Sequence, residues 1–146
     1  MHTWLLLQHR VPTEPSAARV SVWRKMKRLG GILLQDAVWV IPATPRTSEQ
    51  LQWLAAEIVD LGGESRVWEA HVAIGEEQIL VNQFQSQVDA IYAEILADLE
   101  HEDADLAMLA RRYQQARTID YFSSALGERV RAALLTRKTV GGACSG

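Results

Sequence analysis

The sequence predicts a mixed α+β protein, in which a small sheet covered by helices is followed by a purely helical segment. Short apolar runs alternate with amphipathic stretches in the first half, and paired glycines end two of those stretches. After Gly75 the apolar residues recur at helical spacing only. The 146 residues are 48% apolar and 23% charged, which is typical of one globular domain with an extension and excludes wholesale disorder.

The first half contains four strand-like and two helix-like segments. The apolar run at residues 3–9 predicts a buried strand, and Pro12 and Pro15 break the chain before Ser16, which can cap a helix. The elements that follow are a helix, two strands, a helix and a strand, at residues 17–29, 32–35, 38–41, 45–61 and 64–74. This order is that of the ferredoxin-like split βαβ sandwich, with two helices on one face of a four-stranded antiparallel sheet. We expect it to span residues 1–75.

Helical patterns fill the rest of the chain. Residues 79–99 keep an apolar stripe through an acidic stretch, and two more helices are indicated around Leu109 and Val130. Because such helices cannot bury their apolar faces alone, we expect residues 76–138 to form a helical extension packed on the sheet domain. Residues 139–146 are small and glycine-rich, and predict a flexible tail.

Charge is unevenly distributed along a chain whose formal net charge is −3. Residues 10–28 carry six basic residues and one acid, residues 76–105 carry nine acids and no lysine or arginine, and residues 111–138 carry seven basic residues and two acids. This segregation can leave a basic face on an acidic protein, which is the condition for a polyanionic partner.

The first helix concentrates this positive charge. If Val22, Met26 and Leu29 face the core, a turn of 100° per residue gathers the basic residues on or beside the outer face. These candidate phosphate ligands are Arg24, Lys25, Lys27 and Arg28. Such a row suits DNA phosphates, because each neutralised phosphate releases counterions. The alternative is a solvated face without a partner.

Arg19 lies on the same helix but beside Val22 and Trp23, near the inward stripe. A guanidinium there needs a carboxylate, carbonyls or an anion. It is either an oxyanion ligand or a structural arginine, stacked on Trp23 or paired with an acid such as Glu69.

The tryptophans, histidines and the cysteine do not indicate a nucleic-acid stacking surface, a metal site or a catalytic site. The five tryptophans are explained more simply by a helix-on-sheet core than by a base-stacking platform; they are Trp4, Trp23, Trp39, Trp53 and Trp68. The four histidines and Cys144 lack metal-ligand spacing, so we expect no metal and no cofactor. Without paired carboxylates, a phosphate-binding glycine loop or an activated thiol, we expect no enzymatic activity.

No apolar run is long enough to span a membrane and no leader is evident, so we expect a cytoplasmic protein.

Six sequence motifs follow one another along the chain. They are Trp4-Leu-Leu-Leu, Pro12-Thr-Glu-Pro, Ala18-Arg-Val-Ser-Val-Trp-Arg-Lys-Met-Lys-Arg-Leu-Gly30, Leu33-Leu-Gln-Asp-Ala-Val-Trp-Val-Ile-Pro42, Leu109-Ala-Arg-Arg-Tyr-Gln-Gln-Ala-Arg and Ile119-Asp-Tyr-Phe. Together these motifs resemble the N-terminal domain of the chromate-resistance regulator ChrB. The resemblance covers residues 3–135, and the helix–hairpin portion is also similar to the ferredoxin-like part of PaaX-type repressors. The chain ends where the family's second domain would begin, and Ala37 stands where a hairpin glycine is expected.

The resemblance implies a bacterial regulator of chromate-efflux genes whose N-terminal domain binds DNA. Arg19, with the basic pair Arg111 and Arg112, is then the candidate site for chromate or another oxyanion. The alternative is a homodimeric interaction module that binds no nucleic acid, for which the acidic net charge and the lack of a helix-turn-helix signature argue. A third class, an enzyme such as a nuclease, lacks a carboxylate at the end of the first strand, which reads Gln8-His9-Arg10.

Overall fold

The computed structural model describes residues 1–12 and 16–144. The chain divides into two compact units, a first unit at Met1–Leu80 and a second unit at Val81–Gly146. The border falls inside one continuous helix, α3 (Glu77–Leu99).

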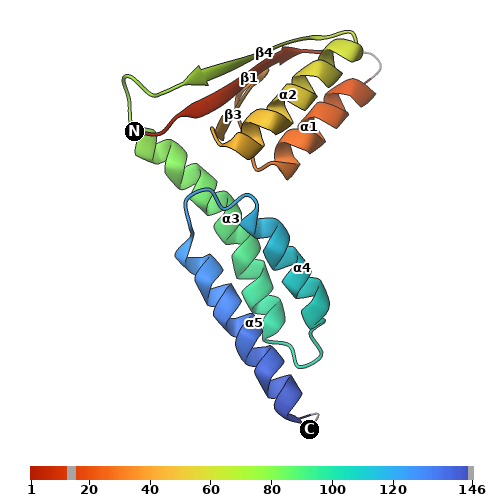
Figure 1. The fold of residues 1–146 in the computed structure, drawn as a ribbon, viewed down its shortest axis with the longest axis vertical. Helices are drawn as coiled ribbons and strands as arrows, with labels where there is room; N and C mark the ends of the chain where they lie inside the picture. The colour runs from red at the N-terminus through yellow and green to blue at the C-terminus, as the bar shows by residue number, and fades with distance from the viewer. Residues whose placement is uncertain (13–15, 145–146) are drawn as a thin grey trace. The chain divides into compact units, whose positions relative to one another are not determined.

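The first unit contains a four-stranded antiparallel sheet and two helices that lie side by side on it (Figure 1). In chain order its elements are β1 (Trp4–Arg10), α1 (Ala17–Arg28), β2 (Ile32–Gln35), β3 (Val38–Pro42), α2 (Pro45–Asp60) and β4 (Glu64–Ala70). The strand order is β2-β3-β1-β4, and every neighbouring pair is antiparallel. The predicted mixed α+β class is confirmed, and the order of elements is that of the split βαβ arrangement.

The core of the first unit lies between the sheet and the two helices. Strand β1 buries Leu5 and Leu7, which lie opposite Ile41 and Trp39 of β3. Helices α1 and α2 contribute aliphatic side chains at helical spacing, namely Ala18, Val22, Met26, Leu51, Leu54 and Ile58. The predicted inward stripe of α1 is therefore confirmed.

Paired glycines end both helices, as the sequence predicts. At the end of α1 the Gly31 N–H donates to Met26 O and the Gly30 N–H to Lys27 O, and Gly62 and Gly63 repeat this pattern after α2. Gly30 has φ of +80° and Gly62 of +85°, the left-handed conformation that a Schellman motif requires.

Three local predictions differ from the structure. Ser16 precedes α1 in helical conformation without a capping side-chain hydrogen bond, so the predicted N-cap is wrong. Strand β4 ends at Ala70, short of the predicted residue 74. The β2–β3 turn has Ala37 where glycine was expected, and neither Asp36 nor Ala37 has a positive φ. It is therefore neither of the primed two-residue turns, and the register shifts between Leu33 and Gln35 instead.

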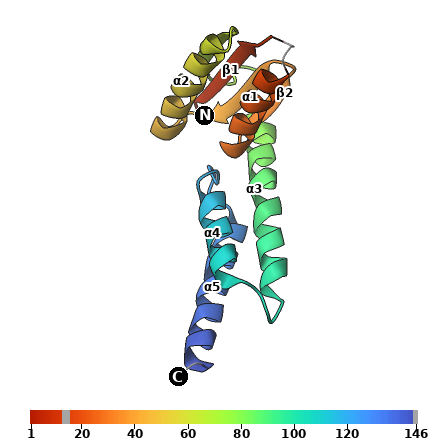
Figure 2. The same ribbon diagram turned by 90° about the vertical axis from the view of Figure 1, so that its right-hand side faces the viewer.

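The second unit is helical (Figure 2). It contains most of α3, then α4 (Leu106–Arg117) and α5 (Ala125–Cys144). Its core combines α3 residues spaced by three or four with partners from the other two helices: Val88, Tyr92, Ile95, Leu99, Leu109, Tyr113, Ala116 and Val130. The buried Tyr92 hydroxyl donates to Asp120 Oδ2 at 2.9 Å, which satisfies its hydrogen-bonding capacity inside the core.

Helix α5 extends further than the sequence predicts. It continues to Cys144, through residues 139–144 of the segment for which a flexible tail was predicted, whereas residues 145 and 146 lie outside the described residues. No helix within residues 1–12 and 16–144 is both long and apolar enough to cross a membrane.

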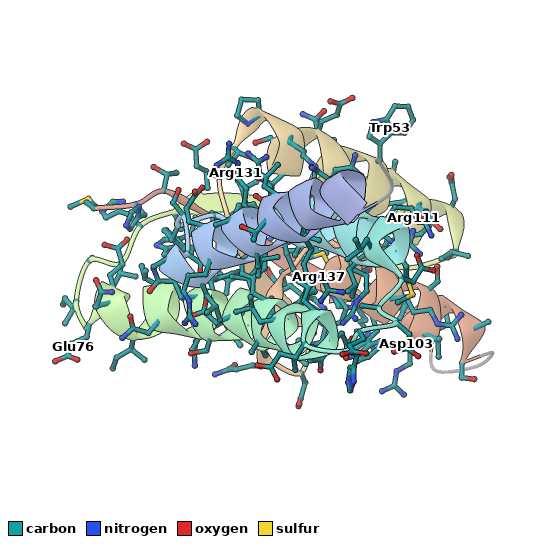
Figure 3. All side chains as sticks on the ribbon, turned by 90° about the horizontal axis from the view of Figure 1, so that it is seen from below. Trp53, Glu76, Asp103, Arg111, Arg131 and Arg137 are labelled. Atoms are coloured by element: carbon teal, nitrogen blue, oxygen red, sulfur yellow. The ribbon has the colours of Figure 1, made fainter. Side chains whose placement is uncertain are left out.

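The tryptophans do not all enter the core. Trp4 and Trp39 are each 2% exposed, as predicted, but Trp23, Trp53 and Trp68 are 51%, 70% and 47% exposed. Trp53 projects from α2 into solvent (Figure 3). The prediction of a core role is wrong for these three, because an indole in a helix or edge strand is buried only if its own position faces the other layer.

Candidate nucleic-acid interface

Helix α1 presents a buried apolar face and an opposite cationic face. Its twelve residues, AARVSVWRKMKR, include no acid and bury Ala18, Val22 and Met26 against the rest of the first unit. The spacing of these three positions leaves Arg24, Lys27 and Arg28 exposed, as the helical wheel predicts. The sheet and α2 therefore hold the cations on a fixed scaffold.

The exposed cations are not neutralised by neighbouring acids. Arg24, Lys27 and Arg28 form no ion pair with any residue in the described ranges. Lys25 differs, because its ammonium group pairs with the Glu57 carboxylate of α2. Three of the four predicted phosphate ligands are thus available to a polyanion, and the fourth ties α1 to α2.

The surface around Arg24 and Arg28 is shallowly hollowed. These two guanidinium side chains, one helical turn apart, line a groove of about 370 Å³ together with Ser21 and Lys25. Serine hydroxyls, like guanidinium groups, donate hydrogen bonds to phosphate oxygens. The groove therefore combines charge with neutral donors.

Lys27 is placed next to an exposed indole. Its Nζ lies 5.9 Å from the centroid of the Trp23 ring, one helical turn away, within the range of a cation–π contact. Such a contact at an exposed site is worth about 0.5–1 kcal/mol and does not remove the positive charge. It restricts where the ammonium group lies.

The helix itself accounts for part of this charge. Lys25, Lys27 and Arg28 occupy the last turn of α1, where cations stabilise the negative end of the helix dipole by about 0.3–1 kcal/mol each. That effect explains the position of Arg24 less well, since Arg24 lies further from the end. The helix dipole alone therefore does not explain Arg24.

Arg19 is exposed, not inward-facing as predicted. It lines a hollow between α1, the end of β1 and the β2–β3 turn, with Trp23 and Asp36 also in the lining. No ion pair joins it to Glu69 or to any other acid among the residues that the structure describes. His9 and Arg10, which line the same hollow, were not among the predicted site residues. The alternation of side chains along a strand could have indicated His9, because it shares the helix-covered face of β1 with Leu5 and Leu7.

Arg111 and Arg112 belong to the second unit, whereas Arg19 belongs to the first. The Arg112 guanidinium donates to Asp98 Oδ2 and to Glu94 Oε2, both at 3.0 Å, and so links α4 to α3. Arg111, its neighbour, is exposed and has no ion pair within the described ranges (labelled in Figure 3). Arg112 is therefore engaged by two carboxylates and is a structural residue, not an open anion ligand.

No group of three or more His, Cys, Asp or Glu side chains that could hold a metal is found in the described part of the chain. The first unit is a small α+β domain whose helix α1 has exposed cations. Residues 19–118 match the family described as "Protein ChrB, N-terminal", and the chain belongs to this family, which confirms the resemblance.

A curated relative carries the same name. The chain is 30% identical over 133 residues to Protein ChrB of Cupriavidus metallidurans, an alignment that covers 82% of this chain and 40% of that protein. The chain thus spans less than half the length of the relative. No solved structure matches the chain.

Proposed function

We propose that the chain is a DNA-binding module of a chromate-responsive regulator, which contacts phosphates through Arg24, Lys27 and Arg28 of α1. The observation that carries the proposal is that these three cations are exposed and form no ion pair with a described residue. Membership of the ChrB N-terminal family supports the regulatory context. The role is one of binding, not catalysis, in the cytoplasm.

Phosphate contacts alone position a protein on DNA without reading its sequence. The proposal therefore predicts binding to duplex of any sequence, with Kd in the range of about 10⁻⁴–10⁻⁶ M that is typical of non-specific binding at physiological salt. Three phosphate contacts contribute a slope of about −2.7 to log K against log salt concentration.

The test replaces the three α1 cations with glutamine together (R24Q/K27Q/R28Q) and measures duplex binding by fluorescence anisotropy over a series of salt concentrations. The matched control, R111Q/R129Q/R131Q, removes the same charge from exposed residues of the second unit. We expect the α1 variant to lose at least tenfold in affinity at low salt, and its salt slope to fall by about 2.7. The control should keep both values.

Equal losses in the two triple variants would mean that net charge, and not α1, governs binding. Absence of duplex binding by the unaltered chain would instead favour the alternative proposal, a homodimeric interaction module. Sedimentation of the same samples measures that second candidate directly.

A further inference from the structure

The hollow beside Arg19, which we call the Trp23 hollow, has the size of a small-molecule site. Its volume is about 550 Å³, inside the range of about 300–1,000 Å³ that is typical of ligand pockets. Three segments form its walls: the end of β1, helix α1, and the β2–β3 hairpin. It adjoins the groove at Arg24 and Arg28, with which it shares Ser16 and Val20, but neither arginine lines it, so binding here does not rest on the proposed function.

Aromatic and aliphatic side chains form much of the lining. Trp39 is 2% exposed, whereas Trp23 is 51% exposed, and Leu33 of β2 also contributes apolar surface. A half-exposed indole beside a hollow leaves a large apolar face in water, and covering it with a flat ring is favourable by area burial and by stacking.

The polar groups of the lining favour an anion. Arg10 and Arg19 are lining residues, and Asp36 is the one acid in the described part of the lining. Arg10 alternates to the opposite face of β1 from His9, so Arg19 is the guanidinium group placed to meet a ligand. Neither arginine is ion-paired to a residue within the described ranges. Guanidinium groups bind carboxylates and phosphates through paired N–H donors, so an anionic ligand group has partners here.

His9 adds an unsatisfied buried atom. Its imidazole lines the hollow, and its Nδ1 is buried with no hydrogen-bond partner in the part of the chain that the structure describes. Burial lowers the pKa of His9, so its ring is neutral at pH 7 and carries one donor and one acceptor nitrogen. Protein atoms already cover this Nδ1, so His9 contributes a neutral wall to the hollow and not a contact to the ligand.

A bare tetrahedral oxyanion uses less of this lining than a flat aromatic anion does. Such an ion would engage a guanidinium group on one wall and leave the indole surface uncovered. We propose that the Trp23 hollow binds a flat aromatic anion, with its ring against Trp23 and its carboxylate or phosphate on Arg19.

The test uses 2-naphthoate as the probe and the neutral 2-naphthamide as its matched analogue, with binding to the full chain measured by isothermal titration calorimetry. We expect the carboxylate to bind at least tenfold more tightly than the amide. R19Q should remove that preference, and W23A should weaken both ligands at least tenfold. The controls are R24Q and W53A, because Arg24 and Trp53 are exposed residues outside the hollow.

The proposal would be overturned by equal affinity for the carboxylate and the amide, by equal effects of R19Q and R24Q, or by no binding of either ligand at millimolar concentration. If chromate binds with a heat that is lost in R19Q, and naphthoate does not bind, the hollow is assigned to oxyanions instead. Because R19Q leaves the three α1 phosphate ligands intact, duplex binding should survive it, which separates this test from that of the proposed function.

Discussion

Arginines that connect helices in the second unit contrast with the exposed cations on α1 of the first unit. In the second unit arginines hold helices together: Arg112 links α4 to two carboxylates of α3, and Arg137 of α5 donates to the Leu99, His101 and Glu102 carbonyl oxygens at the end of α3 (Figure 3). In the first unit Arg24, Lys27 and Arg28 of α1 have no such partner among the described residues.

Acids of the first unit are engaged instead. Glu57 pairs with Lys25, and Glu77 accepts hydrogen bonds from the His2 backbone N–H and the Trp4 indole N–H at 2.8 and 2.9 Å. A run of basic residues is therefore not a site by itself. A basic residue is engaged where a carboxylate of the neighbouring helix lies within reach, as Glu57 does for Lys25 and Asp98 for Arg112.

The largest stability difference that this comparison predicts is between adjacent arginines of α4. R112Q should lower the free energy of unfolding by about 1 kcal/mol, because it removes two charge-assisted hydrogen bonds at partly exposed sites and leaves Glu94 and Asp98 without their cation. R111Q should stay within about 0.5 kcal/mol of the unaltered chain. Urea unfolding followed by far-ultraviolet circular dichroism measures both.

All five tryptophans lie in the first unit, so tryptophan emission reports on that unit selectively. A loss of stability in R112Q that appears in the dichroism and not in the emission would place the effect in the second unit. An R111Q variant as unstable as R112Q would contradict the distinction between engaged and open arginines.

Much of the fold follows from local patterns. The glycine pairs and the spacing of Val22 and Met26 were sufficient to predict α1, because helix ends and amphipathic faces depend on a few neighbouring residues. The start of α2 at residue 45 was also predicted, and in the structure a capping box between Thr44 and Thr47 forms there.

The site was only partly predictable, because ion pairing depends on which elements become neighbours in space. The pairs Lys25–Glu57 and Arg112–Asp98 join different helices, and no sequence spacing predicts them. Likewise, Arg19 was placed near the core by its angle on the wheel, whereas the Trp23 hollow beside it leaves it exposed.

A smaller effect is expected from releasing the one engaged cation of α1. E57Q removes the partner of Lys25, which should raise duplex affinity two- to threefold and steepen the salt slope by up to about 0.9, since one more phosphate contact forms. The stability cost should be below about 1 kcal/mol, because both side chains are more than one-third exposed. Anisotropy titrations measure the affinity.

The control is E49Q, which removes the same charge from an exposed position of α2, whereas the ion pair of Lys25 is with Glu57. If E49Q and E57Q raise affinity equally, the gain comes from net charge and Lys25 does not contact phosphate.

The smallest effect is expected at Glu77, where α3 begins beside β1. The N–H donors of His2 and Trp4 hold the pKa of the Glu77 carboxyl below its usual range, so the carboxylate is stabilised by folding. This contribution is fully present above the pKa that the group has in the unfolded chain, and it is lost as pH falls through the lower pKa of the folded state. E77Q should therefore be less stable than the unaltered chain at pH 7, and the difference should shrink as the solution is acidified toward about pH 3. Urea unfolding followed by tryptophan emission measures this difference, since Trp4 is one of the donors.

The exposed neighbour Glu76 provides the matched control. If E76Q lowers the free energy of unfolding with the same pH dependence as E77Q, the general charge near the start of α3 sets that dependence, and not the pair of N–H donors.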